Sequence, residues 1–231
     1  MRGKSMRKTK PAGSRDSIIQ AVEEAGSSDA IFFGYPLREN GLFLQQDPEE
    51  FGSFVHYMAT KIKPAEYSMD IGIASGGQTK FLRDYYSTDK TIVVDVGTHP
   101  VFPHWARIKK DLNSDLVEEI ISDSHSPEVR QRLLKYENKI DFAFVDGDHT
   151  YHGLRKDIFL TKELMRVGGY MVLHDTLGVW DCKRVFDDLI QAKDFILVRN
   201  FAIRFGISIW QLQRKKRIPT AFNRATGRGK L

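Results

Sequence analysis

The segment KIDFAFVDGDHTYHG, residues 139–153, gathers ionisable side chains at the end of a short apolar run. Phe142–Asp146 has the length and composition of a buried strand that ends on a carboxylate. Asp148, His149 and His152 follow within a few residues. Carboxylates and imidazoles at one strand end can move protons or ligate a divalent cation, so this segment is a candidate catalytic centre.

Four other apolar segments also end on or just before an acid. They are YSMDIGI, KTIVVDV, LVEEIISD and GGYMVLHD, with acids at Asp70, Asp95, Asp123 and Asp175. Helical patterns separate these segments, and one of them opens with Asp47 as the cap, Pro48 at the first position and Glu50 three residues after the cap. This alternation predicts a parallel sheet covered by helices on both faces, with ligands bound at the carboxyl ends of the strands. DFILVRN and FGISIWQL are expected to form an antiparallel ribbon at the sheet edge.

The turn after the first strand, DIGIASGGQT, contains Gly72, Gly76 and Gly77. Glycine there permits a positive φ and lets a ligand approach the backbone. The spacing matches neither the dinucleotide fingerprint nor the P-loop. Asp95 follows Gly72 by 23 residues, where an acid can accept both ribose hydroxyls, and Asp123 can contact an adenine amino group. Together these residues predict an adenosine-containing ligand.

The runs FAFVDGDHTYHGLRKDI and GGYMVLHD together resemble class I S-adenosylmethionine-dependent methyltransferases. The similar subgroup is the one called cephalosporin-hydroxylase-like, which is related to macrolide-sugar O-methyltransferases, and the resemblance covers about residues 44–210. It implies an α/β fold: a Rossmann-like, doubly wound seven-stranded sheet with the last strand antiparallel and helices on both faces. The implied contacts to the cofactor are Asp70, Gly72, Ser75 and Gly76 around the methionine portion, Asp95 at the ribose, and Asp123 with Ser124 beside the adenine.

The same resemblance implies a metal site, because related O-methyltransferases hold one divalent cation at these strand ends. Asp146 and Asp175 match the outer positions, whereas His174 stands where the relatives often carry an acid. Magnesium prefers oxygen ligands, and an imidazole suits manganese, iron or zinc better. The expected ligands are therefore Asp146, His174 and Asp175, with Mg or Mn as the ion. Asp146, His149 and His174 are the expected catalytic residues, with either histidine as general base if no metal binds.

Charge is distributed unevenly along the 231 residues, which carry a net charge of +5. The two ends hold 13 of the 35 basic residues and no acid, so residues 16–213 have a net charge of −8. We expect a basic disordered tail over 1–15, an N-terminal segment on the acceptor side over 16–43, the S-adenosylmethionine-binding methyltransferase domain over 44–213, and a second basic disordered tail over 214–231. No apolar run is long enough to predict a membrane span, and the single cysteine excludes an internal disulfide. With no secretory signal, we expect a cytoplasmic protein.

Three functions are compatible with these patterns. The favoured one is O-methylation of a small molecule or sugar, with or without a divalent metal. The basic tails leave open nucleic-acid methylation, although no N-P-P-Y-type tetrad is present. The third is an S-adenosylmethionine-binding module without catalysis. An iron hydroxylase is disfavoured because it leaves the glycine turn and Asp95 without a role. The sequence identifies neither the acceptor nor the oligomeric state, and it is compatible with a homo-oligomer.

Overall fold

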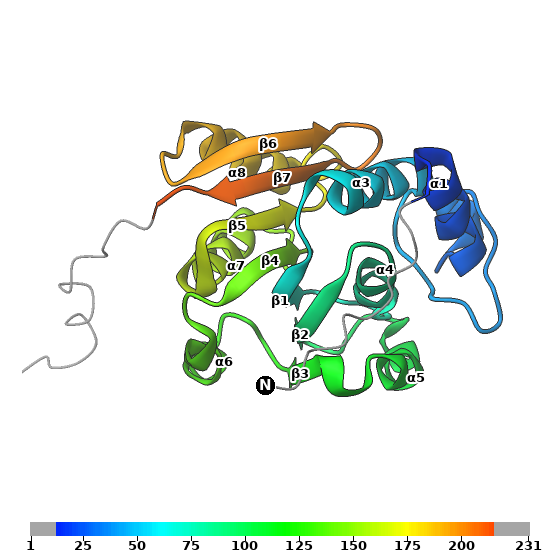
Figure 1. The fold of residues 1–231 in the computed structure, drawn as a ribbon, viewed down its shortest axis with the longest axis horizontal. Helices are drawn as coiled ribbons and strands as arrows, with labels where there is room; N and C mark the ends of the chain where they lie inside the picture. Colours follow the sequence, from blue (N-terminus) through cyan, green and yellow to red (C-terminus); the bar gives the residue numbers. More distant parts are fainter. Residues whose placement is uncertain (1–12, 215–231) are drawn as a thin grey trace, which may run out of the picture.

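Seven strands form one mixed sheet in the computed structural model, which describes residues 13–214 (Figure 1). Their order is β3-β2-β1-β4-β5-β7-β6. The strands are β1 (Ala65–Ile71), β2 (Thr88–Asp95), β3 (Leu116–Ile121), β4 (Ile140–Val145), β5 (Met165–Leu173), β6 (Phe195–Phe201) and β7 (Ile207–Leu212). β1 to β5 pair in parallel, whereas β7 is antiparallel to both β5 and β6. The predicted fold class and the antiparallel edge ribbon are confirmed.

Helices cover both faces of this sheet, as Figure 1 shows. The helices are α1 (Arg15–Ala25), α2 (Ala30–Phe33), α3 (Pro48–Lys61), α4 (Gly77–Tyr85), α5 (Trp105–Ile108), α6 (Pro127–Leu133), α7 (Tyr151–Leu164) and α8 (Trp180–Gln191). α6, α7 and α8 pack into one apolar core cluster, α1, α3 and α4 into a second, and α5 into a third. Short 3-10 helices span Phe102–His104, Lys109–Asp111, Asn113–Asp115 and Leu134–Tyr136.

The central strands are buried on both sides, which explains their continuous apolar runs. All six residues of β4 are buried, and so are the last five of β2, Thr91–Asp95. The strand order reverses between β1 and β4, because β1 is followed in space by β2 on one side and β4 on the other. Such a switch point leaves an opening at the carboxyl ends of the strands, where α/β proteins bind ligands.

α3 begins at the predicted residue, but one of its side chains behaves differently from the prediction. Asp47 caps the helix, with its Oδ1 accepting from the Glu50 backbone N–H at 3.0 Å. In a capping box the Glu50 carboxylate would accept the Asp47 backbone N–H, but Oε2 of this fully buried residue accepts the backbone N–H groups of Ile203, Arg204 and Gly206 instead. Those donors lie in the β6–β7 loop, where they have no strand partner. Glu50 therefore ties this loop to α3.

Only some of the expected domain boundaries lie within the described residues. Arg15, expected to end the N-terminal tail, is the first residue of α1, with Ser14 as its cap. The other basic residues of that tail, and residues 215–231, lie outside the described residues. Over residues 13–214, no helix combines the length and apolarity that crossing a bilayer requires.

Candidate active site

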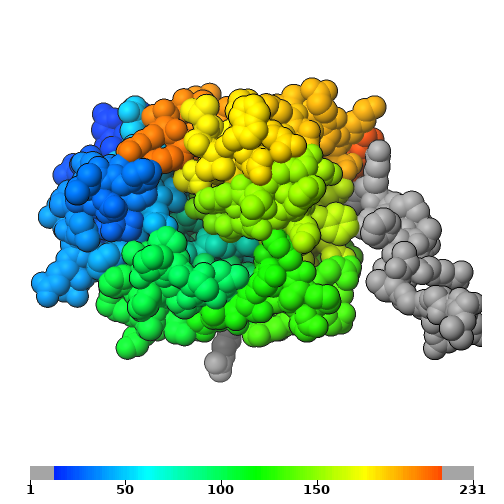
Figure 2. Space-filling view, turned by 180° about the vertical axis from the view of Figure 1, so that it is seen from behind, coloured from blue at the N-terminus to red at the C-terminus, as the bar shows by residue number. Residues whose placement is uncertain are grey.

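A cavity of about 1040 Å³ opens at the carboxyl ends of the parallel strands. Figure 2 shows the molecule hollowed at its middle, between the blue N-terminal segment, the green middle of the chain and the yellow segment. The loops after all five parallel strands line this cavity, as does the N-terminal segment at Phe32, Phe33 and 44–46. Of the five predicted strand-end acids, four line it: Asp95, Asp123, Asp146 and Asp175. The fold thus brings four of the five to one place.

Two glycines of the turn let neighbouring parts of the protein approach its backbone very closely. Gly72 has φ 78°, and a Cβ there would lie 2.1 Å from the backbone oxygen of Asp146. Gly76 has φ 79°, and its Cβ would lie 2.1 Å from the Trp105 ring. A side chain at Gly72 would push the β1 and β4 loops apart, since neither a positive φ nor such a contact is tolerated. Ser75 is also engaged within the protein, because its Oγ donates to Leu42 O at 2.7 Å.

Asp95 organises the turn from the neighbouring strand. Its Oδ2 accepts from the Ile73 N–H at 2.7 Å and the Ala74 N–H at 3.3 Å. Its Oδ1 accepts from the Gly97 N–H at 2.6 Å. These three bonds use three of about four lone-pair sites of the carboxylate, so Oδ1 can still accept one hydroxyl donor from a ligand in the cavity.

Asp70 is the strand-end acid that does not line the cavity. Its Oδ2 instead accepts from the Thr79 hydroxyl at 2.5 Å, beneath the glycine turn. Burial raises the pKa of Asp70 to about 7, and the Thr79 hydrogen bond opposes this only in part. Asp70 therefore lies under the turn and is not among the residues that line the cavity.

Asp157, which the sequence did not single out, anchors the loop after β3. Asp157 on α7 is fully buried, and its Oδ1 accepts from Ser124 Oγ at 2.6 Å and lies 3.2 Å from His125 Nε2. Its Oδ2 has no hydrogen-bond partner in the part of the chain that the structure describes, and it lies close to Gly147 in the loop after β4. Burial raises the pKa of Asp157 despite these neighbours. A charged residue on the apolar face of a predicted helix was the signal that could have identified it.

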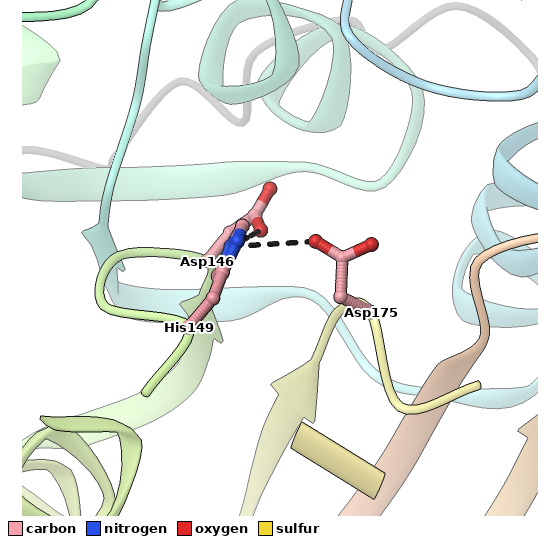
Figure 3. A group of neighbouring side chains, drawn as sticks. All are labelled: Asp146, His149 and Asp175. Atoms are coloured by element: carbon pink, nitrogen blue, oxygen red, sulfur yellow. Dashed lines mark hydrogen bonds and ion pairs between the residues drawn. The ribbon is translucent and has the colours of Figure 1, made fainter. Parts of the chain in front are cut away.

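The ionisable cluster lies where β4 and β5 end. Ligand atoms of Asp146, His149 and Asp175 all lie within 4.8 Å of one another, and Figure 3 shows the imidazole linked to both carboxylates. His149 Nε2 is 3.2 Å from Asp146 Oδ1 and 3.3 Å from Asp175 Oδ2. His174 Nδ1 lies at almost the same distances, 3.4 Å and 3.2 Å, from these two oxygens. Two imidazoles thus flank one pair of carboxylates.

The two histidines differ in exposure. The His149 side chain is 45% exposed and that of His174 only 5%. Among the described residues, neither ring nitrogen of His174 makes a hydrogen bond of good geometry, although Nδ1 faces both carboxylates. Burial would raise the pKa of Asp146, but His174 and His149 outweigh burial and lower it. The Asp146 hydrogen bond raises the pKa of His149. Asp175 has φ 58°, a left-handed conformation that costs a non-glycine residue energy and that functional sites often contain.

Comparisons with known proteins match the part of the chain that forms this site. The family model of a methyltransferase domain matches residues 69–176, which run from β1 to the end of the ionisable cluster. The chain carries an S-adenosylmethionine-dependent methyltransferase domain. The matched range contains the glycine turn, Asp95, Asp123 and the whole Asp146–Asp175 cluster. No curated protein sequence matches the chain significantly.

Several solved structures share this methyltransferase fold. The O-methyltransferase TomG of Streptomyces achromogenes, solved with S-adenosylmethionine, has a TM-score of 0.53 at 14% identity, over 86% of this chain and 91% of its own. An rRNA methylase of Streptococcus thermophilus also scores 0.53 at 14% identity, over 71% and 97%. A protein of Corynebacterium glutamicum scores 0.56 at 17% identity, over 89% and 94%. At such identities the likeness concerns the fold, and the acceptor must be argued from the site.

Proposed function

We propose that this methyltransferase transfers the methyl group of S-adenosylmethionine to a hydroxyl oxygen of a small molecule, assisted by a divalent cation. The observation that carries the proposal is the cluster of Asp146, His149, His174 and Asp175 at one end of the cofactor cavity. A methyltransferase needs only alignment for the displacement itself, so ionisable groups at this point indicate that an acceptor must be deprotonated or oriented.

The lining of the cavity supports the proposed cofactor contacts. In this proposal the methionine portion lies along the turn at Gly72, while Gly76 is not among the residues that line the cavity. Asp95 then contacts the ribose, and Asp123 with Ser124 lies beside the adenine. The cavity is rich in carboxylates, and negative charge favours a bound sulfonium over the neutral thioether product. Asp70 and Ser75 act indirectly in this proposal, because they hold the turn in place. Asp70 supports it from beneath through Thr79, and Ser75 ties it to Leu42.

The residues of the cluster fit a divalent cation with mixed oxygen and nitrogen ligands. Asp146, His174 and Asp175 would hold it, since a ligand role would satisfy the buried His174 ring, whose nitrogens make no hydrogen bond of good geometry within residues 13–214. The imidazole favours manganese over magnesium. A bound cation would lower the pKa of the acceptor hydroxyl.

The exposed His149 is then available for the acceptor's proton. The acceptor oxygen forms a bond to the methyl carbon as the bond between that carbon and sulfur breaks. The electron pair of the broken bond stays on sulfur, and the hydroxyl proton passes to His149 Nε2. The products are the methyl ether and S-adenosylhomocysteine. Holding both reactants in line can supply several kcal/mol of the barrier reduction, roughly 7 or more in favourable cases.

Calorimetric titration with S-adenosylhomocysteine tests the cofactor assignment. We expect binding by the wild type and a loss of about 100-fold in affinity for Asp95→Ala, because a hydrogen bond to a charged group is lost together with the acceptor that holds the turn. Asp89→Ala is the matched control, since Asp89 is exposed at the opposite end of the same strand. Equal affinities for the two variants would remove the ribose assignment.

Manganese binding, followed by its electron paramagnetic resonance signal, separates the two histidines. We expect His174→Ala to weaken Mn²⁺ affinity at least about 10-fold and His149→Ala to keep it while losing turnover. The competing ligand set is Asp146, His149 and Asp175, which predicts the reverse order.

Nucleic-acid methylation is the second candidate, and one observation favours it. A second cavity of about 790 Å³ lies between α6 and α7 and shares Ser124 and His125 with the cofactor cavity. Its cationic lining residues are Arg130, Arg155 and Lys156, and it contains no acid. If this surface binds a phosphate backbone, methyl transfer to RNA should fall steeply with salt.

A further inference from the structure

The part of the cavity wall next to His174 and Asp175 is aromatic. Phe32 and Phe33 of α2 and Phe205 of the β6–β7 loop all line the cavity. The rings of Phe32 and Phe205 stack at 5.6 Å, and Phe33 meets Phe32 edge-on at 4.9 Å. Phe205 lies 6.0 Å from the His174 ring, so the aromatic surface reaches the ionisable cluster. We refer to Phe32, Phe33 and Phe205 as the phenylalanine wall.

The phenylalanine wall is fixed in place by charged groups behind it. Glu50 accepts backbone N–H groups on both sides of Phe205, from Arg204 at 2.8 Å and Gly206 at 2.9 Å. The Arg204 guanidinium lies over the Phe32 ring at 5.2 Å and over the Phe205 ring at 4.9 Å, and it donates to the Phe32 carbonyl. Segments about 170 residues apart in the sequence are thereby joined into one rigid surface. A surface held in this way is preorganised for a ligand, since no loop has to be ordered on binding.

The edge of the cavity continues this apolar character. Ile31, beside Phe32, is almost completely exposed, and so is much of Leu177, whose backbone N–H donates to Phe205 O at 2.8 Å. Trp180, one residue after the cavity-lining Val179, is also exposed. Figure 2 shows the blue N-terminal segment adjoining the orange segment around β7 at this edge. Exposed apolar residues gathered at a cavity mark a binding surface for an apolar molecule.

The side chains of the phenylalanine wall carry no hydrogen-bond donor or acceptor. A sugar or a phosphate backbone needs several polar partners when it leaves water, and this wall would leave them unmade. A planar aromatic ring loses nothing there, because it gains apolar contact and ring stacking. Since the wall ends at the ionisable cluster, a hydroxyl on such a ring would reach His149 and the two carboxylates.

We infer that the methyl acceptor is an aromatic hydroxyl compound whose ring packs on the phenylalanine wall. This inference rests on the proposed function and names the substrate class of the same site. The acceptor loses its phenolic proton to His149 and gains the methyl carbon, and the cofactor leaves as S-adenosylhomocysteine. The expected product is an aryl methyl ether.

The test measures transfer of a tritiated methyl group from S-adenosylmethionine to three kinds of acceptor, with Mn²⁺ present. The probes are catechol and 3,4-dihydroxybenzoate, glucose, and a uridine oligonucleotide. We expect turnover with the aromatic compounds alone. Phe32→Ala should raise their KM about 10-fold while affinity for S-adenosylhomocysteine stays unchanged. Ile190→Ala is the matched control, because Ile190 is 47% exposed, as Phe32 is 52%, and it lines neither cavity.

The outcomes separate this inference from the proposed function. A wild-type protein that is folded and does not bind S-adenosylhomocysteine would overturn the proposed function itself. Binding without methylation of any aromatic probe, or with methylation of the sugar or oligonucleotide instead, would overturn the inference and leave the methyltransferase assignment standing. Equal KM values for Phe32→Ala and Ile190→Ala would show that the phenylalanine wall does not bind the acceptor, and would overturn the inference as well.

Discussion

Asp70 makes the stability of this protein depend on pH in a direction opposite to that of most carboxylates. Burial beneath the glycine turn raises its pKa from an ordinary 3.8 to about 7 in the folded state. Between these two values the unfolded chain has released the proton and the folded chain still holds it. Stability falls with rising pH wherever the unfolded state binds fewer protons, so Asp70 lowers stability progressively from about pH 4 to about pH 7.

The size of this effect follows from the distance between the two pKa values. Each pH unit in that window costs 1.36 kcal/mol per proton, so the contribution of Asp70 to the free energy of unfolding falls by about 4 kcal/mol across it. Above pH 7 both states are ionised and the penalty is constant. Because the whole domain is expected to be stable by only about 5–15 kcal/mol, a change of this size is readily measured.

Urea unfolding of the wild type and of Asp70→Asn between pH 4 and pH 8 isolates this contribution. The amide keeps an oxygen that can accept from the Thr79 hydroxyl, but it does not titrate. We expect the stability of Asp70→Asn relative to the wild type to rise by about 4 kcal/mol over the window and to level off above pH 7. Asp89→Asn, at an exposed position, should follow the wild type at every pH. A constant difference between Asp70→Asn and the wild type would refute the assignment of a raised pKa to Asp70.

Two further variants test how the loops around the cavity are held. Gly72→Ala should cost at least about 2 kcal/mol in urea unfolding, because its Cβ would strike the Asp146 backbone. Gly168→Ala also has a positive φ but meets open space, so a similar loss there would contradict the close-approach argument. Glu50→Gln should cost about 2–3 kcal/mol, because three backbone N–H groups exchange a charged acceptor for a neutral one. The exposed Glu49→Gln should be nearly neutral, and equal losses in the two glutamine variants would count against this role of Glu50.

Much of the fold could be predicted because its determinants are local. The apolar run before Asp146 and the alternation of strands and helices identified β4 and the parallel sheet, and the Asp47–Pro48 pair located the start of α3. Because parallel strands end at one edge of the sheet, the sequence predicted that Asp95 and Asp175 lie at the same edge, and both line the cavity in the structure. Each of these predictions needed only periodicity, a cap or the geometry of a parallel sheet.

Other features could not be predicted, because they depend on which segments meet in space. A position at a strand end was not enough to place Asp70 in the cavity, since the direction of its side chain is decided by the pleat and by Thr79 on α4. Glu50 had the spacing of a capping residue, yet its carboxylate is bound to donors more than 150 residues away. Asp157 was hidden inside an ordinary helical pattern, because its partner Ser124 lies in a different loop.

The sequence by itself therefore determined the order of the elements, the turn that needs glycine and the acids at the strand ends, because φ preferences, periodicity and strand polarity act within a few residues. Only the tertiary structure decided which side chains share the cavity. It placed His149 and His174 on either side of Asp146 and Asp175, and it brought Phe32 beside Phe205. These contacts form only when distant segments pack into one core, and no local preference encodes them.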